Sequence, residues 1–126
     1  MRKNSSKFVF VILFLSYFLS GCNQHPKINI GEALTKSEEE FKKEGIECVS
    51  AFGGEKIIKF RLLLKEPPTN EEATNQFKKI LDIIATHSNN NDIWDIYNAD
   101  FDLSYEDNVI YEGKKDAGND LKVKAH

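Results

Sequence analysis

Residues 55–87 read EKIIKFRLLLKEPPTNEEATNQFKKILDIIATH, and this stretch decides the fold class. In its first part, 55–64, apolar residues recur at every second position, which is typical of a β-strand with one buried face. Pro67 and Pro68 end that strand, because neither residue can donate a hydrogen bond to a neighbouring strand. From Thr69 the spacing of the apolar residues becomes helical, so the sequence predicts a strand followed by a long helix.

The start of this helix has a recognisable signal. Thr69-Asn70-Glu71-Glu72 has the spacing of a capping box, in which the threonine and the second glutamate satisfy free backbone N–H groups. The helix should end near Thr86 or His87. Its predicted buried stripe consists of Ala73, Phe77, Ile80, Leu81 and Ile84.

A hairpin and a first helix are predicted on the N-terminal side. Strands 46–52 and 55–64 flank Gly53-Gly54, which supply the positive φ that a tight hairpin turn requires. The first helix is predicted to begin at Glu32, with Ser37 as an alternative start. Gly45 is expected just after its last turn, where a left-handed residue commonly ends a helix.

A second hairpin is predicted on the C-terminal side. Apolar and polar residues alternate from 97 to 106, Asp107-Asn108 are expected to form the turn, and 109–112 return as the next strand. Residues 114–126 show no periodicity, and we expect a flexible C-terminal tail there.

These elements predict a single α+β domain over residues 32–113, in the order α-β-β-α-β-β. The expected packing is two helices on one face of a four-stranded antiparallel sheet. Phe41-Lys42-Lys43 and Phe77-Lys78-Lys79 occupy similar places in the two helices, 36 residues apart. This match is consistent with a duplicated αββ unit, which we keep as a hypothesis.

The first 21 residues have a different composition from the rest of the chain. Residues 1–7 carry three basic groups and no acid, and residues 8–19 (FVFVILFLSYFL) are almost wholly apolar. A basic start, an apolar core of about 7–15 residues and small residues at the cleavage site are typical of a secretory signal. The apolar run is too short to span a bilayer, which requires about 20 residues.

Leu19-Ser20-Gly21-Cys22 resembles the lipobox of bacterial lipoproteins. The resemblance implies that the Cys22 thiol carries a diacylglyceryl lipid and that a signal peptidase cleaves between Gly21 and Cys22. Two acyl chains should hold the protein stably on the membrane, since one chain binds only reversibly. Residues 22–31 would then be the lipidated N-terminus and a tether. The expected location is the extracytoplasmic side of the plasma membrane, or the outer membrane in a host with two membranes.

The net charge of the chain without residues 1–21 disfavours two classes of binding partner. Removing residues 1–21 takes away three basic residues and no acid, so the formal charge changes from −3 to −6. An acidic domain disfavours nucleic acid as a partner and disfavours adsorption to an anionic membrane surface.

No catalytic set, metal site or cofactor other than the lipid is predicted. Once Cys22 is lipidated, Cys48 has no partner for a disulfide within the chain. We interpret Cys48 as a buried small hydrophobe, with an intermolecular disulfide as the alternative. The three histidines, His25, His87 and His126, are not spaced as metal ligands.

The candidate binding surface lies in the second hairpin, which is rich in acids. Neighbouring carboxylates on one face of a strand lie about 6.6–7 Å apart, so a solvated face is favoured over a metal site. Trp94 is the aromatic residue expected to be partly exposed. The predicted interaction surface consists of Trp94, Asp100, Asp102 and Glu106.

These features favour a non-enzymatic protein-interaction module that binds another envelope or extracellular protein. The alternative is an envelope sensor that binds a small ligand or a calcium-like ion through the same acidic hairpin.

Overall fold

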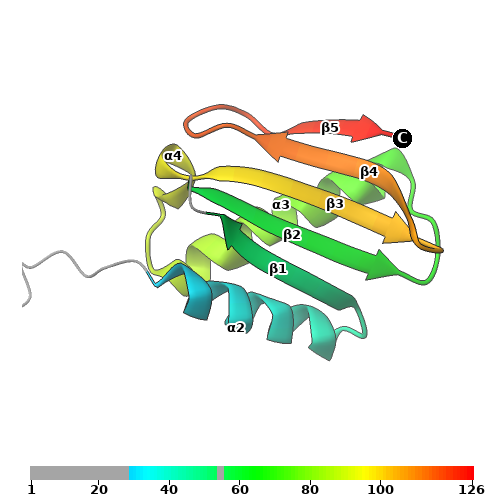
Figure 1. Cartoon of the computed structure of the whole chain (residues 1–126), viewed down its shortest axis with the longest axis horizontal. Helices are drawn as coiled ribbons and strands as arrows, with labels where there is room; N and C mark the ends of the chain where they lie inside the picture. Colours follow the sequence, from blue (N-terminus) through cyan, green and yellow to red (C-terminus); the bar gives the residue numbers. More distant parts are fainter. Residues whose placement is uncertain (1–28, 54–55) are drawn as a thin grey trace, which may run out of the picture.

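The computed structural model describes residues 29–53 and 56–126. Its helices are α2 (Ile30–Lys43), α3 (Asn70–Ser88) and the short α4 (Ile93–Ile96) (Figure 1). Its strands are β1 (Glu47–Gly53), β2 (Ile57–Leu64), β3 (Asn98–Tyr105), β4 (Asn108–Lys115) and β5 (Lys122–Ala125). The predicted α+β class is confirmed. The predicted signal peptide, Gly21, Cys22 and most of the tether lie outside the described residues.

The sheet has five strands in the order β1-β2-β3-β4-β5. Its pairs are antiparallel except β2 and β3, which run parallel. The prediction of a four-stranded antiparallel sheet was therefore wrong in strand number and in one pairing. The physical reason for the parallel pair is α3, which carries the chain back to the starting end of β2 before β3 begins; a parallel pair requires such a crossover.

The segment 114–126, predicted as a flexible tail outside the domain, contains the end of β4 and the whole of β5. β5 is held by backbone pairing, with Val123 opposite Gly113, and the His126 N–H donates to the Ile110 carbonyl at 2.9 Å. Backbone hydrogen bonds do not depend on an apolar repeat, so the sequence pattern gave no signal for this strand. The domain therefore extends beyond its predicted limit at residue 113.

Local sequence signals define the ends of the helices, but the predicted start of α2 was wrong. α2 begins before Glu32 and Ser37, because the Asn29 side chain caps it by accepting from the Glu32 N–H at 3.0 Å. Gly45 follows the helix with φ +79°, as predicted, and the N–H of Ile46 reaches back to Phe41.

The capping box of α3 is confirmed. The Glu72 N–H donates to Thr69 Oγ1 at 3.1 Å, and the Thr69 N–H donates to Glu72 Oε1 at 3.0 Å. The helix ends at Ser88, and Asn89 follows in a left-handed conformation with φ +56°. The end therefore lies within two residues of its predicted position.

The hairpin turns differ in detail from the predicted ones. Gly53 pairs with Ile57, so residues 54–56 connect β1 to β2, and Gly54 of the predicted turn lies outside the described residues. The second turn is Glu106-Asp107 rather than Asp107-Asn108. Its φ values of +50° and +64° are those of the mirror-image turn that suits a two-residue hairpin.

The core lies between the sheet and the two long helices. Phe60 and Phe101 lie opposite each other in the paired strands β2 and β3, so they point to the same face of the sheet. Phe41 of α2 packs on Phe60, and Phe77 of α3 packs on Phe101, with ring centroids 5.6 and 6.2 Å apart. Both helices therefore cover the same face, as predicted; Figure 1 shows α3 crossing behind the strands and α2 alongside β1.

Candidate interaction surface

The face of the sheet turned away from α2 and α3 is the candidate functional surface. Successive residues of a strand point to opposite faces, so burial of Ala99, Phe101 and Leu103 turns Asp100 and Asp102 to the other side. Paired residues of neighbouring strands point to the same face, so the register assigns the residues of the other strands to one face or the other. We call the following residues the open face: Glu47, Val49, Ala51, Lys59, Arg61, Asp100, Asp102, Glu112, Lys114, Lys122 and Lys124.

One row of the open face is organised by an ion pair between neighbouring strands. Arg61 Nε donates to Asp102 Oδ1 at 2.6 Å, and Arg61 Nη2 donates to Asp102 Oδ2 at 3.1 Å. This two-point contact fixes the orientation of both side chains. The hydrogen bonds to Asp102 and its negative charge raise the pKa of the Arg61 guanidinium, so the guanidinium stays charged at all physiological pH values.

The next acidic group in that row is also paired. Glu112 lies opposite Asp102 in the register, and its Oε1 lies 3.1 Å from His126 Nε2. The hydrogen bond with His126, reinforced by the charge of that histidine and of Lys114 and Lys124, lowers the pKa of Glu112. The carboxylate is therefore held in its charged form.

The second row places an acid between basic residues. Asp100 lies opposite Lys59 on one side and opposite Lys114 on the other, and Lys114 lies opposite Lys122. Directly opposed residues have Cβ atoms about 4.5–5.5 Å apart, so their charges interact. The acids predicted in this hairpin thus lie among basic groups, and the open face has both signs of charge.

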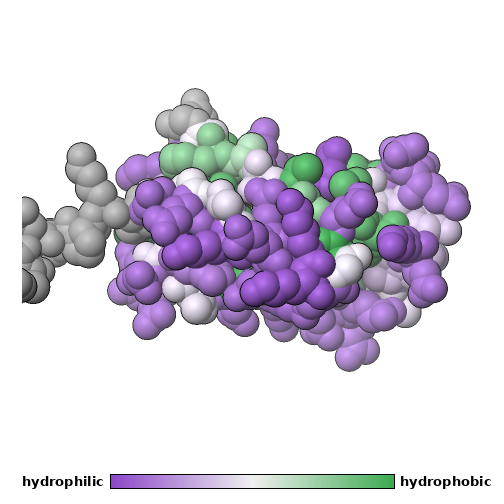
Figure 2. All heavy atoms as spheres, turned by 90° about the horizontal axis from the view of Figure 1, so that it is seen from below, coloured by the Kyte–Doolittle hydropathy of each residue, from purple (hydrophilic) through white to green (hydrophobic). Residues whose placement is uncertain are grey.

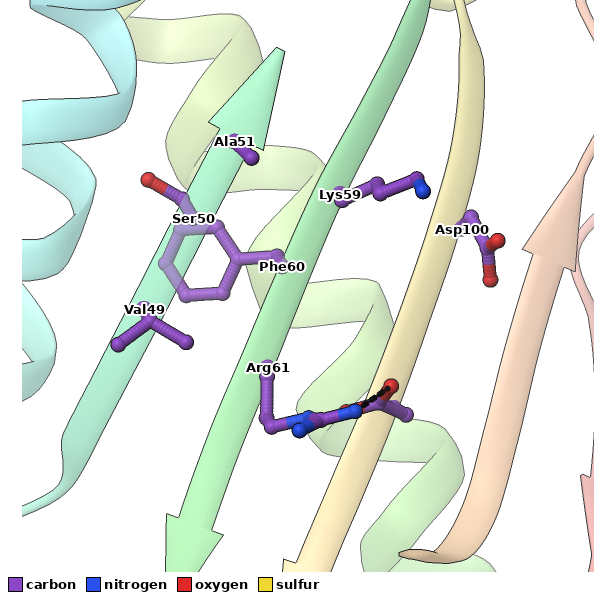
Figure 3. Close-up of a pocket in the computed structure, with 8 residues that line it drawn as sticks. Val49, Ser50, Ala51, Lys59, Phe60, Arg61 and Asp100 are labelled. Atoms are coloured by element: carbon purple, nitrogen blue, oxygen red, sulfur yellow. Dashed lines mark hydrogen bonds and ion pairs between the residues drawn. The ribbon is translucent and has the colours of Figure 1, made fainter. Parts of the chain in front are cut away.

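A shallow depression of about 270 Å³ lies on the β1 side of this face (Figure 3). Its lining combines the apolar side chains Val49 and Ala51 with the charged residues Lys59, Arg61, Asp100 and Asp102. Val49, which lies in the edge strand β1, is 54% exposed. The depression therefore offers an apolar floor with charged groups along one side.

Trp94 does not belong to this surface, so its predicted role was wrong. It is only 9% exposed, its Nε1 donates to the Leu81 carbonyl at 2.9 Å, and its ring packs edge-on against Phe101. Its own carbonyl accepts from the Gly118 N–H and from Lys115 Nζ. Trp94 therefore holds α4 against the sheet and the β4–β5 connection.

The other acids of the predicted cluster are dispersed. Asp100 and Asp102 share the open face, whereas Glu106 lies in the β3–β4 turn, and Asp92 and Asp95 lie at α4. Within residues 29–53 and 56–126, no group of three or more acids, histidines or cysteines is arranged to hold a metal ion. The acids lie close together in the sequence but do not converge in space.

Cys48 is buried in β1 under α2, as predicted. Its Sγ lies 3.6 Å from the Glu38 carbonyl. Burial raises the pKa of the Cys48 thiol, and the negative charge of Glu38 raises it further, so the thiol stays neutral at pH 7. Since the thiolate is the nucleophile, this environment disfavours reactivity.

We expect Cys48 in the Cys22→Ser protein to react with a thiol-labelling reagent at least about 100-fold more slowly when folded than in urea. Folding raises the pKa of the Cys48 thiol, so the protonated thiol favours the folded state. This contribution to the free energy of unfolding is complete at neutral pH. It is lost as the pH rises from the thiol pKa of the unfolded chain to that of the folded protein. Labelling rates between pH 7 and 10 measure both effects. Equal rates in the folded and unfolded protein would contradict the buried, neutral thiol.

The sequence contains a signal for part of this surface. The period-two pattern of β2 already places Lys59 and Arg61 opposite the buried face. Their juxtaposition with Asp100 and Asp102 depends on the parallel pairing of β2 and β3, which the pattern does not specify. Lys122 and Lys124 were missed because their strand was predicted as a tail.

No helix in the described part of the chain is long and apolar enough to cross a membrane. Comparison of the chain with protein-family models and with curated proteins found no match.

Proposed function

We propose that this protein is a membrane-anchored lipoprotein of the bacterial envelope and acts as a non-enzymatic protein-interaction module. The lipobox sequence supports the anchor at Cys22. The open face supports the interaction, and its partner is another envelope or extracellular protein.

The observation that carries the proposal is the composition of the open face. Both signs of charge stand in fixed rows on a rigid sheet, beside the exposed apolar residues Val49 and Ala51. Protein interfaces combine an apolar centre with a polar rim, and their charges determine specificity and association rate. Small-molecule sites are usually concave, with about 300–1,000 Å³ of enclosed volume, so the shallow depression suits a partner side chain better.

The same geometry disfavours the ion-sensor alternative. A calcium-like ion needs six to eight oxygen ligands. Both carboxylate oxygens of Asp102 already accept from Arg61, and Glu112 is engaged by His126. An ion would have to displace these basic groups.

The test is site-specific photo-crosslinking in cells that produce the full-length, lipid-anchored protein. A crosslinking amino acid replaces Val49 on the open face or Lys78 on the exposed side of α3. We expect a crosslinked partner from position 49 and a yield at least about tenfold lower from position 78. Equal yields from the two positions would contradict the proposal.

A charge change on the open face should weaken this interaction. With the crosslinker at position 49, Lys59→Glu is expected to lower the crosslinked yield by about tenfold, equivalent to about 1.4 kcal/mol of binding free energy. Lys78→Glu is the matched control, because it makes the same charge change on an exposed residue of the opposite layer. Thermal unfolding of both variants shows whether the fold is intact, and an unchanged yield for Lys59→Glu in a folded protein would overturn the role of this face.

A further inference from the structure

A second apolar surface lies at one end of the domain. Only three large hydrophobic side chains are exposed among the described residues, and two of them, Phe52 (47%) and Ile96 (42%), lie near this end. The half-buried Tyr97 follows Ile96, and its ring centroid is 5.7 Å from that of Phe52. We call Phe52, Ile96 and Tyr97 the apolar tip.

The apolar tip lies at the end of the domain where the chain enters α2. In Figure 1, the start of α2, the end of β1 and α4 all lie at the same end, opposite the β3–β4 turn. Figure 2, seen from below, also has an apolar area at this end, with hydrophilic side chains beside it.

The length of chain between this end and Cys22 limits its distance from the membrane. Seven residues, 22–28, precede Asn29, and a fully extended chain spans at most about 3.3–3.6 Å per residue, or roughly 25 Å in total. A tether this short gives the tip a high effective concentration at the bilayer surface, of the order of millimolar for a short flexible linker. Even a weak apolar contact would then be occupied much of the time.

We propose that, in the lipidated protein, the apolar tip lies against the lipid bilayer to which Cys22 is anchored. This inference rests on the proposed anchor. The strands then stand steeply on the membrane, the β3–β4 turn points away from it, and the open face is directed sideways, where a partner in the same envelope compartment can reach it.

The charges near the tip determine the kind of contact. Lys56 and Lys115 are basic, but the three acids Asp92, Asp95 and Asp116 are exposed close to the same end. These acids repel anionic lipids over about 8 Å at physiological salt. The contact is therefore apolar rather than electrostatic, and it is stronger on a zwitterionic surface.

The test uses the full-length protein, lipidated in cells, purified and reconstituted into phosphatidylcholine vesicles. A photo-crosslinking amino acid is placed at position 52 or 96 in the tip, or at the exposed control position Glu106 at the far end. Mass spectrometry then measures phospholipid adducts. We expect the yield at 52 and 96 to exceed that at 106 by at least about tenfold, because a hydrophobic residue held at the interface stays in contact with lipid.

The outcomes separate this inference from the proposed function. A lipidated Cys22 with equal adduct yields at 52, 96 and 106 overturns the tip contact and leaves the anchor intact. A Cys22 without lipid overturns both. Crosslinks from 52 and 96 to a second copy of the chain, or a yield that rises when an anionic phospholipid is added, would also overturn the apolar contact with lipid.

Discussion

Replacing Phe101 with alanine is expected to lower the free energy of unfolding by about 3–5 kcal/mol. Phe101 is fully buried in β3, and its ring lies 6.5, 6.2 and 6.0 Å from the rings of Phe60, Phe77 and Trp94. Its removal leaves a cavity between the sheet, α3 and α4, where none of these neighbours can fill the space without disturbing the others. Since small domains have free energies of unfolding of about 5–15 kcal/mol, this loss would leave the folded state with little net stability.

Urea-induced unfolding followed by circular dichroism measures this effect without relying on Trp94, whose fluorescence the substitution would itself change. The matched control is Phe52→Ala, which removes the same atoms from a side chain that is 47% exposed. We expect the control to lose less than about 1.5 kcal/mol, since a partly solvated site leaves no closed cavity. Equal losses in the two variants would contradict the position of Phe101 at the centre of the core.

The second large effect is expected at Gly113, where β4 passes under α3. A Cβ atom at this position would lie 2.8 Å from Cδ2 and 2.9 Å from Cγ of the fully buried Phe77. Gly113→Ala therefore forces the Phe77 ring into its neighbours, and overpacking of this kind costs about 1–3 kcal/mol. The reason for a glycine here is close approach between side chain and backbone, since its φ is not in the left-handed region.

Gly31→Ala is the matched control for this prediction. Gly31 is helical, and a Cβ atom there would meet only Asn29 Oδ1, at an ordinary contact distance of 3.6 Å. Alanine in a helix is favoured over glycine by about 0.5–1 kcal/mol, so the control should be neutral or stabilised. Adding Phe77→Leu to Gly113→Ala should recover part of the loss, because the two sites are in contact. A fully stable Gly113→Ala protein would refute the close packing of β4 on α3.

The acidic hairpin shows how a linear pattern can suggest the wrong charge for a surface. Six acids lie between residues 92 and 107 of the sequence, and this suggested a negatively charged binding site. In the fold, Asp102 meets Arg61, a residue 41 positions earlier, and Asp100 lies between Lys59 and Lys114. The charge of a surface depends on which strands are neighbours, and that is a property of the tertiary structure.

Trp94 illustrates a similar limit. It follows the Asn-rich segment 89–91, which suggested exposure, yet a short helix of four residues turns the ring onto Phe101. No periodicity can be read from one turn of helix, so its burial could not be predicted from local pattern.

The sequence by itself determined the α+β class, the two long helices with the capping box at Thr69 and the glycine at residue 45, and the burial of Cys48. These features depend on residues within a few positions of one another, through backbone capping and the repeat of apolar side chains. The tertiary structure alone decided the parallel pairing of β2 with β3, the addition of β5, and the mixed charge of the open face. Strand neighbours are selected by packing of the whole core and by backbone hydrogen bonds, which every residue can accept and every residue except proline can donate.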